Sequence, residues 1–556
     1  MDRTPSGTPP DEPPHAPAVT RQSSNEVPRL ALENVYEKLA VNPDRTMRFI
    51  ARDGGTVVRT AGEMHADVVA LIDELRSCGL GAGDPVGVLG PNTYEWVLAD
   101  LALLTLRCVP VAVSLDRMTT SEAVAAALER YGLVAALVTG LPALRESTPP
   151  GVAVLEQRPV ALHPIPRAPS GLRPEVATVV FSSGTAGTKK GLMLTDEGIM
   201  NTIRVSAQAW QVREDDDILV VLPFSNFQQR YLMYLAIWAG CSATVVAPER
   251  MFLMLRTLAP TIVLGPPSFF ELTYNRVLAT QGRARLPHRV AAILHAGLPD
   301  RLTRPLRARL GRRWTAMYGP RVRLMLTGSA PVQPRMVQVF QQLGAPLHEI
   351  YGSTESGWIA CNLPGRSRVG AAGRPVAGVA VEIAEDGEVL VLVDRPQAVG
   401  YVLEGTETQR DVFLPDGRIA TGDLGTVDRA GFLRLTGRKK NVIITRSGVK
   451  INPETLETAI ETGCPVTKAV VMSRAGDGRL TCVAFLDEDA GWDDRVAEVQ
   501  AHVDRTNRAG EASHRIAEVV FRRSSELSVE SGLLTRNLKV DRQAVARTLL
   551  DAAGSR

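Results

Sequence analysis

The sequence predicts an α/β fold with a large N-terminal domain built of several subdomains and a smaller α+β domain at the C-terminus. The chain has 556 residues, which is too long for one ordinary hydrophobic core. Short apolar runs rich in β-branched residues alternate with amphipathic helical segments over most of its length. Near the end, paired strands and tight turns replace that alternation, which indicates a separate unit.

The composition is that of an ordinary globular protein, with 45% hydrophobic and 22% charged residues. The 63 basic and 60 acidic residues leave a net charge of +3, so the average charge indicates neither nucleic-acid binding nor a membrane surface. The 6 cysteines are dispersed without a CxxC pair, which predicts reduced thiols in a cytoplasmic protein. The longest apolar stretch, Val97 to Leu115, includes Asp100 and Arg107 and therefore predicts a buried helix and strand, not an integral membrane segment.

The first elements follow a tail that is not expected to fold. Residues 1–28 are rich in proline, serine, threonine and charge, and they lack the apolar segment of a signal peptide, so they predict a disordered tail. After the tail, Glu63 to Leu75 has the periodicity of an amphipathic helix. Pro85 to Leu89 and Val109 to Val113 are apolar runs that predict short buried strands.

A loop rich in glycine and hydroxyl groups, FSSGTAGTKKG, runs from Phe181 to Gly191. The apolar run before it predicts a strand, and Thr195 is an expected N-cap for a helix through Trp210, so the loop is expected to join a strand to a helix. Glycines turn backbone N–H groups toward a ligand, hydroxyls donate hydrogen bonds, and lysines add positive charge. This chemistry suits a polyphosphate, although the Walker pattern is absent and a Gly/Ser linker is the alternative.

The loop resembles the nucleotide loop of the adenylate-forming (AMP-binding) superfamily, which includes acyl-CoA synthetases, luciferases and the adenylation domains of peptide synthetases. Ala186 and Lys189 stand where the family usually has threonine and proline, and Lys190 is retained. The resemblance implies a catalytic role for Lys190. It also implies nucleotide-binding roles for Ser182, Ser183, Gly184, Thr185 and Gly187.

Two further segments match family motifs in the family's order. The strand-like run that begins at Leu324 ends in a turn of small residues, which the resemblance assigns to one wall of the adenine site. The string EIYGSTE implies that Tyr351 stacks on adenine, that Thr354 acts at the α-phosphate, and that Glu355 holds Mg²⁺. The cofactor-binding residues implied by these two segments are Gly328, Ser329, Ala330, Glu349, Tyr351 and Gly352.

The later motifs complete the nucleotide site and add a hinge. In Thr-Gly-Asp, the carboxylate of Asp423 can accept both ribose hydroxyls, although an aspartate in a turn is more often a turn former. The resemblance implies that Arg438 contacts the ribose or phosphates and that Lys440 is the hinge. It further implies that Gly448 admits the pantetheine arm of CoA and that Lys539 is the catalytic lysine of the C-terminal loop.

The acyl pocket is expected near PFSNFQQ, residues 223–229. Asn226 stands where the family usually has histidine; it can hydrogen-bond a carboxylate but cannot titrate, and it also suits a strand-to-helix turn. The end of the apolar run from Thr261 faces the same pocket in the family. The implied substrate-pocket residues are Asn226, Phe227, Gly265, Gly357 and Trp358.

The remaining strands are predicted from turns and apolar runs. An Asp-Gly turn separates Val379 to Ala384 from Glu388 to Val393, which indicates a small β subdomain. In the C-terminal unit, two runs predict a hairpin, followed by a helix near Val496 to Arg508 and a strand from Ile516 to Arg522. The hairpin strands are Ala469 to Ser473 and Leu480 to Leu486.

The resemblance covers about residues 30–545 and implies three parts: the tail at 1–28, an adenylating domain at 29–439 and a mobile lid at 440–556. It implies a two-step ligase that uses ATP, Mg²⁺ and CoA to activate a carboxylic acid, a hydrophobic acid being one option. Three alternatives stay open: an amide synthetase with an amine acceptor, an acyl-AMP ligase that loads a carrier protein, and a non-catalytic adenylate-binding homologue. A homodimer is also left open.

Overall fold

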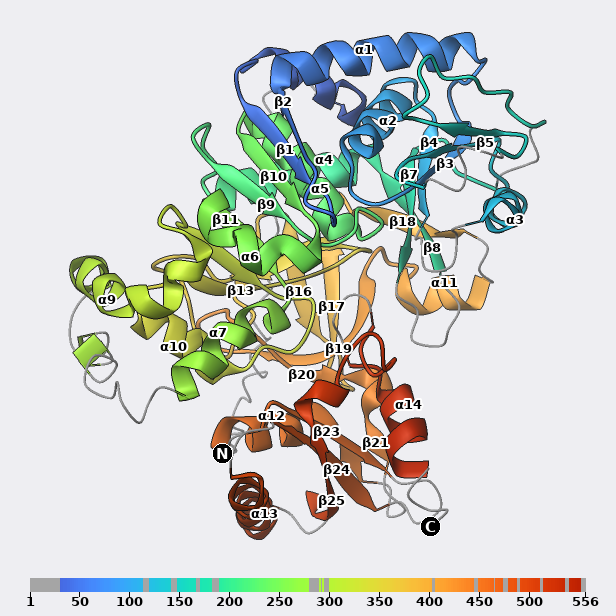
Figure 1. The fold of residues 1–556 in the computed structure, drawn as a ribbon. Coiled ribbons are helices and arrows are strands. Elements are labelled where there is room, and N and C mark those ends of the chain that lie inside the picture. Colours follow the sequence, from blue (N-terminus) through green and yellow to red (C-terminus); the bar gives the residue numbers. More distant parts are fainter. Residues whose placement is uncertain are drawn as a thin grey trace, which may run out of the picture. The chain divides into compact units, whose positions relative to one another are not determined.

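The computed structural model describes residues 31–113, 120–141, 148–166, 171–182, 190–279, 290–291, 293–294, 300–402, 406–444, 449–464, 466–473, 479–487, 491–510, 514–535 and 540–551. The predicted tail at 1–28 lies outside these ranges. Within them, the strands form sheets of nine, seven, four, three and two strands, with helices between them in the chain (Figure 1). The predicted α/β fold class is confirmed.

The seven-stranded sheet has a parallel centre, as alternating strands and helices predict. Its strands, in spatial order, are β18 (Ala398–Val402), β8 (Lys190–Thr195), β7 (Val176–Ser182), β4 (Val109–Val113), β3 (Pro85–Leu89), β5 (Ala135–Val138) and β6 (Val152–Val154). The strands from β7 to β6 are parallel, whereas β8 and β18 are antiparallel to their neighbours. Every residue of β3, β4 and β5 is buried, because both faces of a parallel sheet are covered.

The glycine-rich loop connects two antiparallel strands, so the expectation that it joins a strand to a helix was wrong. β8 pairs with β7, with Val180 opposite Leu192, before the helix begins. The apolar run around Leu192 is short, but β7 and β18 bury it on both edges, and this pairing makes it a strand. The predicted helix then follows as α4 (Asp196–Ala209), and the hydroxyl of its N-cap Thr195 accepts a hydrogen bond from the N–H of Gly198 at 3.1 Å.

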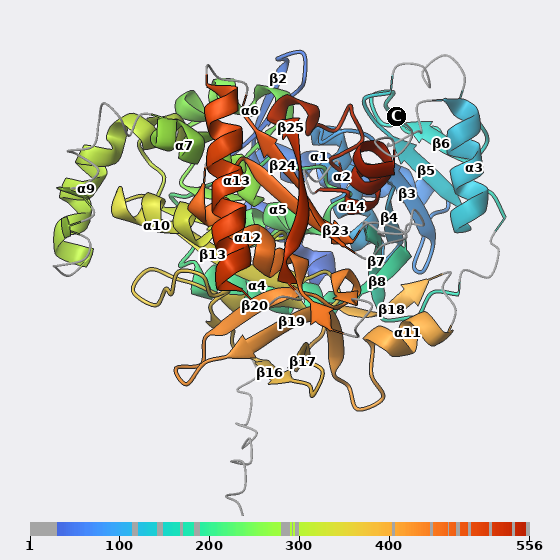
Figure 2. The same ribbon diagram turned by 90° about the horizontal axis from the view of Figure 1, so that it is seen from below.

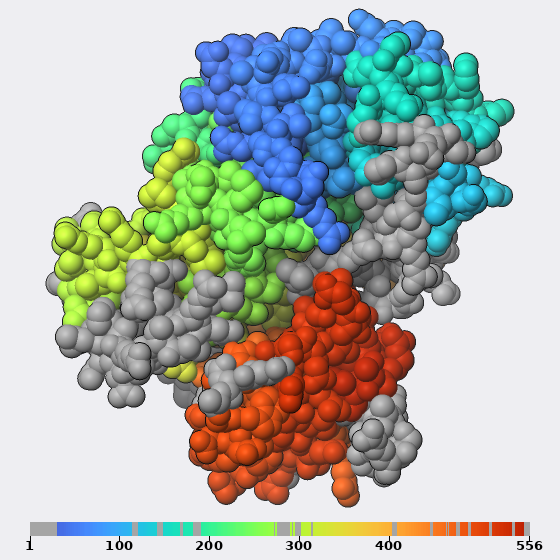
Figure 3. Space-filling model, in the orientation of Figure 1, coloured from blue at the N-terminus to red at the C-terminus, as the bar shows by residue number. Residues whose placement is uncertain are grey.

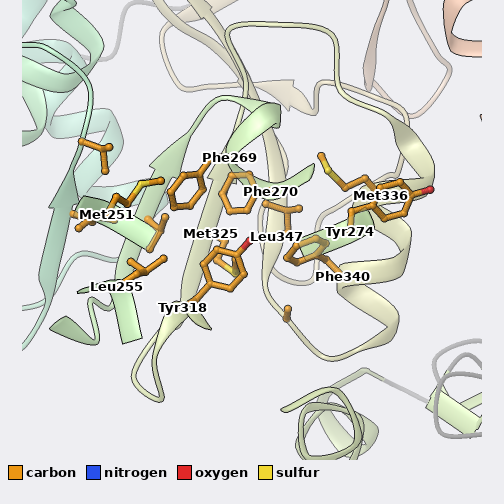
Figure 4. Packing of buried hydrophobic residues seen from close by; sticks show 14 of the residues in the cluster. Met251, Leu255, Phe269, Phe270, Tyr274, Tyr318, Met325, Met336, Phe340 and Leu347 are labelled. Carbon is orange, nitrogen blue, oxygen red and sulfur yellow. The ribbon is translucent and has the colours of Figure 1, made fainter. Parts of the chain in front are cut away.

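The nine-stranded sheet is parallel through its six central strands, β1 and β9 to β13. Its strands, in spatial order, are β15 (Arg374–Pro375), β14 (Gly357–Cys361), β13 (Leu347–Ser353), β12 (Leu324–Thr327), β11 (Ile262–Gly265), β9 (Asp217–Val220), β10 (Ser242–Val246), β1 (Thr46–Ile50) and β2 (Thr56–Thr60). A large apolar cluster fills the space between this sheet and the helices that cover it. Figure 4 shows Phe269 and Phe270 beside Met325 and Tyr318, with Phe340 and Leu347 next to them.

Some helices of this region have well-defined caps. α1 starts with a capping box, in which Thr60 and Glu63 each accept a backbone N–H from the other residue. α3 ends at Gly132 in the left-handed conformation, with φ 61°. The helices that precede residue 413 in the described ranges include η1 (Leu32–Ala40), α1 (Ala61–Ser77), α2 (Tyr94–Thr105), α3 (Ser121–Tyr131), α5 (Phe227–Ala239), α6 (Pro248–Leu258), α7 (Pro267–Ala279), α9 (Asp300–Thr315), η3 (Ala316–Tyr318), α10 (Pro334–Gln342) and α11 (Thr406–Val412).

A four-stranded antiparallel sheet follows, as the Asp-Gly turn predicts. Its order is β16 (Val379–Ile383), β17 (Glu388–Val393), β19 (Ile419–Val427) and β20 (Leu433–Arg438). The chain after it forms a three-stranded sheet with its own apolar core, on which α13 packs through Val499 and Val503 (Figure 2). The elements of this last segment are η4 (Lys439–Asn441), β21 (Ile443–Ile444), β22 (Lys450–Ile451), α12 (Pro453–Gly463), β23 (Lys468–Ser473), β24 (Leu480–Leu486), α13 (Trp492–Ala509), β25 (Ile516–Arg523), η6 (Ser524–Glu526), α14 (Arg542–Val545) and η7 (Ala546–Asp551).

A fully buried ion pair connects three elements, one of which is β7, the strand that precedes the glycine-rich loop. Arg230 on α5 donates from Nε to Asp100 on α2 at 2.9 Å, and a second donor reaches the other carboxylate oxygen. Its remaining terminal nitrogen donates to the hydroxyl of Thr178 on β7 at 2.8 Å, four residues before β7 ends. Tyr234 donates to the same carboxylate. The network therefore fixes the strand that leads into the loop.

Candidate active site

The carboxyl ends of three parallel strands lie side by side and carry predicted site residues. Gly265 of β11 is paired with Thr327 of β12, which is paired with Glu349 of β13. Ligands in such sheets bind beyond the carboxyl ends of the strands. The structure therefore brings one predicted pocket residue, the turn at 328–330 and the Tyr-Gly-Ser-Thr-Glu segment to one edge of the sheet.

The turn after β12 approaches β13 closely. A Cβ atom on Gly328 would lie 2.2 Å from the carbonyl oxygen of Ile350, so only glycine fits there. Ser329 has φ 66°, in the left-handed region that side chains rarely adopt. Its hydroxyl donates to the side-chain oxygen of Gln228 on α5. Strain of this kind clusters at ligand sites. Gln228 was not predicted from the sequence as the partner of Ser329.

Tyr351, Asp423 and Arg438 are in direct contact, although they come from two different sheets. The Tyr351 hydroxyl donates to Asp423 Oδ2 at 2.7 Å, and Arg438 Nε lies 2.5 Å from Asp423 Oδ1. Asp423 and Arg438 are paired directly across β19 and β20. Burial, followed by the charge of Asp423, raises the pKa of Tyr351 well above its ordinary value, so this phenol stays a hydrogen-bond donor. Three side chains predicted to bind the nucleotide thus form one cluster.

The turn between β13 and β14 holds Thr354 and Glu355 against β18. The carboxylate of Glu355 accepts a hydrogen bond from the hydroxyl of Tyr401 at 2.8 Å. Gln397 donates from Nε2 to the carbonyl oxygen of Thr354 at 2.9 Å. β18 pairs with β8, the strand that begins at Lys190. The predicted magnesium-binding carboxylate therefore lies one strand away from the strand that leaves the glycine-rich loop.

Several predicted site residues lie outside the described ranges. These are Ser183, Gly184, Thr185, Gly187, Gly448 and Lys539. The backbones of Ser182 and Lys190 are paired across β7 and β8, which places the two ends of the loop opposite each other. The roles of all these residues remain predictions.

Aromatic side chains meet where the substrate pocket is predicted. Phe227, at the start of α5, stacks on Tyr231 one turn later, with ring centroids 6.4 Å apart. Trp358 on β14 meets Tyr231 edge to face at 5.9 Å, and its Nε1 donates to the Tyr231 hydroxyl at 3.1 Å. Trp210 lies 6.1 Å from Trp358. Tyr231 and Trp210 were not predicted from the sequence as site residues. The four-residue spacing of Phe227 and Tyr231 on a helix is the signal that could have indicated Tyr231.

Two other predicted pocket residues, Asn226 and Gly357, also stabilise the local fold. Asn226 is the N-cap of α5, and its Oδ1 accepts the N–H of Gln228 at 3.1 Å. The amide nitrogen of Asn226 is the group that can donate to a carboxylate. Gly357 has φ 81°, and a Cβ atom there would lie 2.7 Å from the hydroxyl oxygen of Thr202 on α4. Glycine at this position therefore lets β14 pass close to α4.

Lys440 lies in η4, directly after the strand that carries Arg438. Desolvation lowers the pKa of Lys440, the guanidinium of Arg438 lowers it further, and the charge of Asp423 opposes both. The predicted hinge residue is thus electrostatically coupled to the cluster of Tyr351, Asp423 and Arg438. Its role as a hinge remains a prediction.

Glu349 is a buried carboxyl group at the same strand end. The residue is 8% exposed, and one carboxyl oxygen accepts the N–H of Gly370 at 3.3 Å. Burial raises the pKa of Glu349 to about 8, while the Gly370 N–H and Arg434 oppose the shift. This carboxyl group is therefore mostly protonated at neutral pH.

In the wild type, the free energy of unfolding should fall as the pH rises, and the substitution Glu349→Gln should abolish this fall. Because the folded-state pKa of about 8 exceeds the ordinary 4.5, the folded chain keeps a proton that the unfolded chain releases between those values. The free energy of unfolding should fall over that interval by up to about 1.4 kcal/mol per pH unit, and the amide should flatten this slope. Urea unfolding between pH about 5 and about 8 measures it. The exposed Glu382→Gln is the control; equal slopes in all three proteins would contradict the assignment.

The described ranges contain no helix with the length and apolar character needed to cross a membrane. The same residues include no group of three or more His, Cys, Asp and Glu side chains arranged to hold a metal ion. All six cysteines are free in this structure.

The sequence matches the AMP-binding enzyme family over residues 35–403. The curated protein Long-chain-fatty-acid–CoA ligase FadD15 of Mycobacterium bovis is 29% identical, and the alignment covers 92% of this chain and 94% of that protein. Long chain acyl-CoA synthetase 6, peroxisomal, of Arabidopsis thaliana is 24% identical over 82% of this chain and 71% of its own length.

Two solved structures have the same fold. The anthranilate CoA ligase AuaEII superposes with a TM-score of 0.72 at 18% identity, covering 94% of this chain and 98% of its own. The amide bond synthetase McbA of Marinactinospora thermotolerans gives 0.68 at 20% identity, covering 93% and 100%. The family match spans more than half of the chain and agrees with the order of the motifs. The chain therefore belongs to the AMP-binding, adenylate-forming enzymes, and it is of the acyl-CoA synthetase type.

Proposed function

We propose that the protein activates a carboxylic acid with ATP to an acyl-adenylate and then transfers the acyl group to the thiol of CoA. The observation that carries this proposal is the contact of Tyr351, Asp423 and Arg438 at the carboxyl edge of the nine-stranded sheet. It combines an aromatic face for a base, a carboxylate acceptor for ribose hydroxyls and a cation for phosphate in one place. The fatty-acid–CoA ligases among the curated relatives support the choice of CoA and of a hydrophobic acid.

In the first step, a carboxylate oxygen of the acid attacks the α-phosphorus of ATP, and pyrophosphate leaves. The acid and the triphosphate repel each other, so the chain must supply positive charge and hold the two groups in line. Lys190, Lys539 and the hydroxyl of Thr354 are the groups proposed to do this.

Glu355 is proposed to hold Mg²⁺ together with phosphate oxygens, and the ion would supply positive charge against the triphosphate. The donor set fits this role, because a carboxylate has two oxygens and Oε1 of Glu355 accepts a hydrogen bond from Tyr401. A single carboxylate that shares the ion with phosphate is also how Mg²⁺ is commonly held in nucleotide sites.

In the second step, the thiolate of CoA attacks the acyl carbonyl, and AMP leaves. We propose that residues 440–556 form a lid that turns about Lys440, carrying Lys539 away and the Gly448 loop toward the adenylate. This assignment keeps 29–439 as the adenylating domain. Domain closure about a few residues at the end of an element is an established type of motion, and Lys440 stands directly after β20.

The proposed acyl site is the region of Asn226, Phe227 and Trp358. The amide nitrogen of Asn226 can donate to the substrate carboxylate. The rings of Phe227, Tyr231 and Trp358 offer an apolar wall for the acyl group. The Tyr231 hydroxyl already accepts a hydrogen bond from Trp358 Nε1. These aromatic side chains favour a hydrophobic acid as the substrate class.

The deciding experiment measures pyrophosphate release over a panel of aryl, short-chain, long-chain and polycyclic acids, with and without CoA. Acid-dependent release, with one acyl-CoA formed per AMP, is expected. If none of the acids in the panel supports pyrophosphate release, the proposal is overturned for these acid classes. Release that turns over with an amine or a carrier protein but not with CoA would keep the adenylation step and replace the acceptor.

Asp423→Asn should raise the KM for ATP about ten- to a hundred-fold, because a hydrogen bond to a charged group is worth about 1.5–3 kcal/mol. The kcat at saturating ATP should change much less, since the ribose lies far from the reacting phosphorus. The control is Asp416→Asn, which changes a half-exposed turn carboxylate paired with Arg418. An unchanged KM in Asp423→Asn would show that this carboxylate does not bind the ribose.

A further inference from the structure

The excess of positive charge in this chain is concentrated in one segment. Residues 272–348 contain 13 arginines, no lysine and a single acidic residue, Asp300, whereas the whole chain has a net charge of +3. The rest of the chain is therefore acidic on balance. The net charge of the whole chain predicted no binding to a membrane surface, but it is an average that includes one strongly basic region.

Six of these arginines lie on α9, which runs beside α7 and α10 (Figure 2). The described positions of α9 that are exposed recur at the spacing of one helical face, an arc of about 120° at ~100° per residue. This outward face of α9 is defined here by Leu302, Pro305, Leu306, Arg309 and Arg312. Leu302 is 69% exposed and Leu306 is 51% exposed, so the apolar half of the face is in contact with solvent. Figure 3 shows α9 in yellow-green at the molecular surface.

The opposite side of α9 is anchored in the protein. Arg307 is fully buried; its Nε donates to the hydroxyl of Thr303 at 3.2 Å, and Nη1 donates to the backbone carbonyl of Gln341 at the end of α10. This arginine satisfies the carboxyl end of a helix, which is a structural task. The buried side of α9 thus holds the helix in place, while the residues of its outward face are exposed.

We propose that the outward face of α9 docks on an anionic lipid surface. A helix that carries arginine beside exposed leucine matches an interfacial helix, whose apolar side chains enter the headgroup boundary while the cations meet lipid phosphates. Charge complementarity is provided by Arg309 and Arg312, which are exposed on this face, in a segment whose only acidic residue is Asp300. The exposed leucines distinguish this surface from a nucleic-acid site, which pairs cations with polar or aromatic groups.

Binding of the outward face of α9 to lipid does not require the ligase reaction. Under the proposed function, docking would bring the enzyme to the surface in which an amphiphilic acid dissolves. The docking itself can be measured without acid, ATP or CoA, so its failure and a failure of the ligase assignment are distinguishable.

The test measures co-sedimentation of the full chain with phosphatidylcholine vesicles that contain phosphatidylglycerol, and with pure phosphatidylcholine vesicles. Binding is expected only to the anionic vesicles, with a steep decrease at high salt. Arg309→Gln/Arg312→Gln should weaken binding about thirty-fold, since each arginine near such a surface contributes a factor of about five. Leu302→Ser/Leu306→Ser should weaken it at least about tenfold, through the lost apolar contact.

The matched control is Arg505→Gln/Arg508→Gln, which removes two exposed arginines with the same three-residue spacing on α13. This control should bind like the wild type, and thermal unfolding by circular dichroism should be alike for all four proteins. Absence of binding to anionic vesicles, or equal weakening by the α9 and α13 pairs, would overturn the proposal. Binding unaffected by Leu302→Ser/Leu306→Ser, with duplex DNA competing equally at the same phosphate concentration, would assign the face to nucleic acid and also overturn it.

Discussion

Lys539→Ala should slow adenylate formation by about a hundred- to a thousand-fold, the range seen when one preorganised electrostatic donor is removed from a reacting centre. The lysine stands in the segment from Ser531 to Arg542, which resembles the catalytic-lysine loop of the family. Under the proposed function, its charge would be needed while the acid and the α-phosphate are brought together. Thioester formation from a preformed acyl-adenylate should be unchanged, because the phosphorus–oxygen bond is already made in that substrate.

The two half-reactions are followed separately, as pyrophosphate exchange and as acyl-CoA formation from synthetic acyl-adenylate. Arg508→Ala, an exposed cation at the end of α13, is the control and should retain both rates. Full-rate pyrophosphate exchange in Lys539→Ala would remove this lysine from the mechanism. Equal loss of both half-reactions would show that the residue serves the fold and not the first step.

Arg230→Met should lower the free energy of unfolding by about 3–5 kcal/mol, the cost of leaving one partner of a buried ion pair without the other. Asp100 is 1% exposed, and of the two side chains that now donate to its carboxylate only Tyr234 would remain. Thr178 on β7 would lose its contact with the guanidinium at the same time. Urea unfolding followed by circular dichroism measures the shift.

Two companion variants separate the charge from the packing. Asp100→Leu/Arg230→Met removes both charges and should recover much of the stability, because a buried pair often gains little over apolar residues of similar volume. Arg76→Met breaks a surface pair with Asp73, whose side chains are 62% and 70% exposed, and should cost at most about 1 kcal/mol. A loss below about 1 kcal/mol in Arg230→Met would mean that the buried pair does not support the fold.

The sequence by itself determined the family and several of the strands. Apolar β-branched runs such as Pro85–Leu89 and Glu388–Val393 formed strands with the predicted bounds, because such runs are buried on sheets whatever lies beyond them. The Asp-Gly turn at 386–387 separated two strands as expected, since turn conformation depends on adjacent residues. The motifs kept the family's order, and the family match at 35–403 agrees with them.

The tertiary structure alone decided where distant groups meet. β8 was missed because its six residues become a strand by pairing with β7 and β18, and β18 lies about two hundred residues later. Tyr231, Tyr401 and Gln228 were missed as site partners for the same reason. Periodicity and turn signals report contacts within a few residues, whereas the hydrogen bond of Tyr351 to Asp423 and the ion pair of Arg230 with Asp100 form only when separate layers pack. Net charge, being an average over the chain, likewise could not show that arginines gather on α9; only the fold decided which of them face outward.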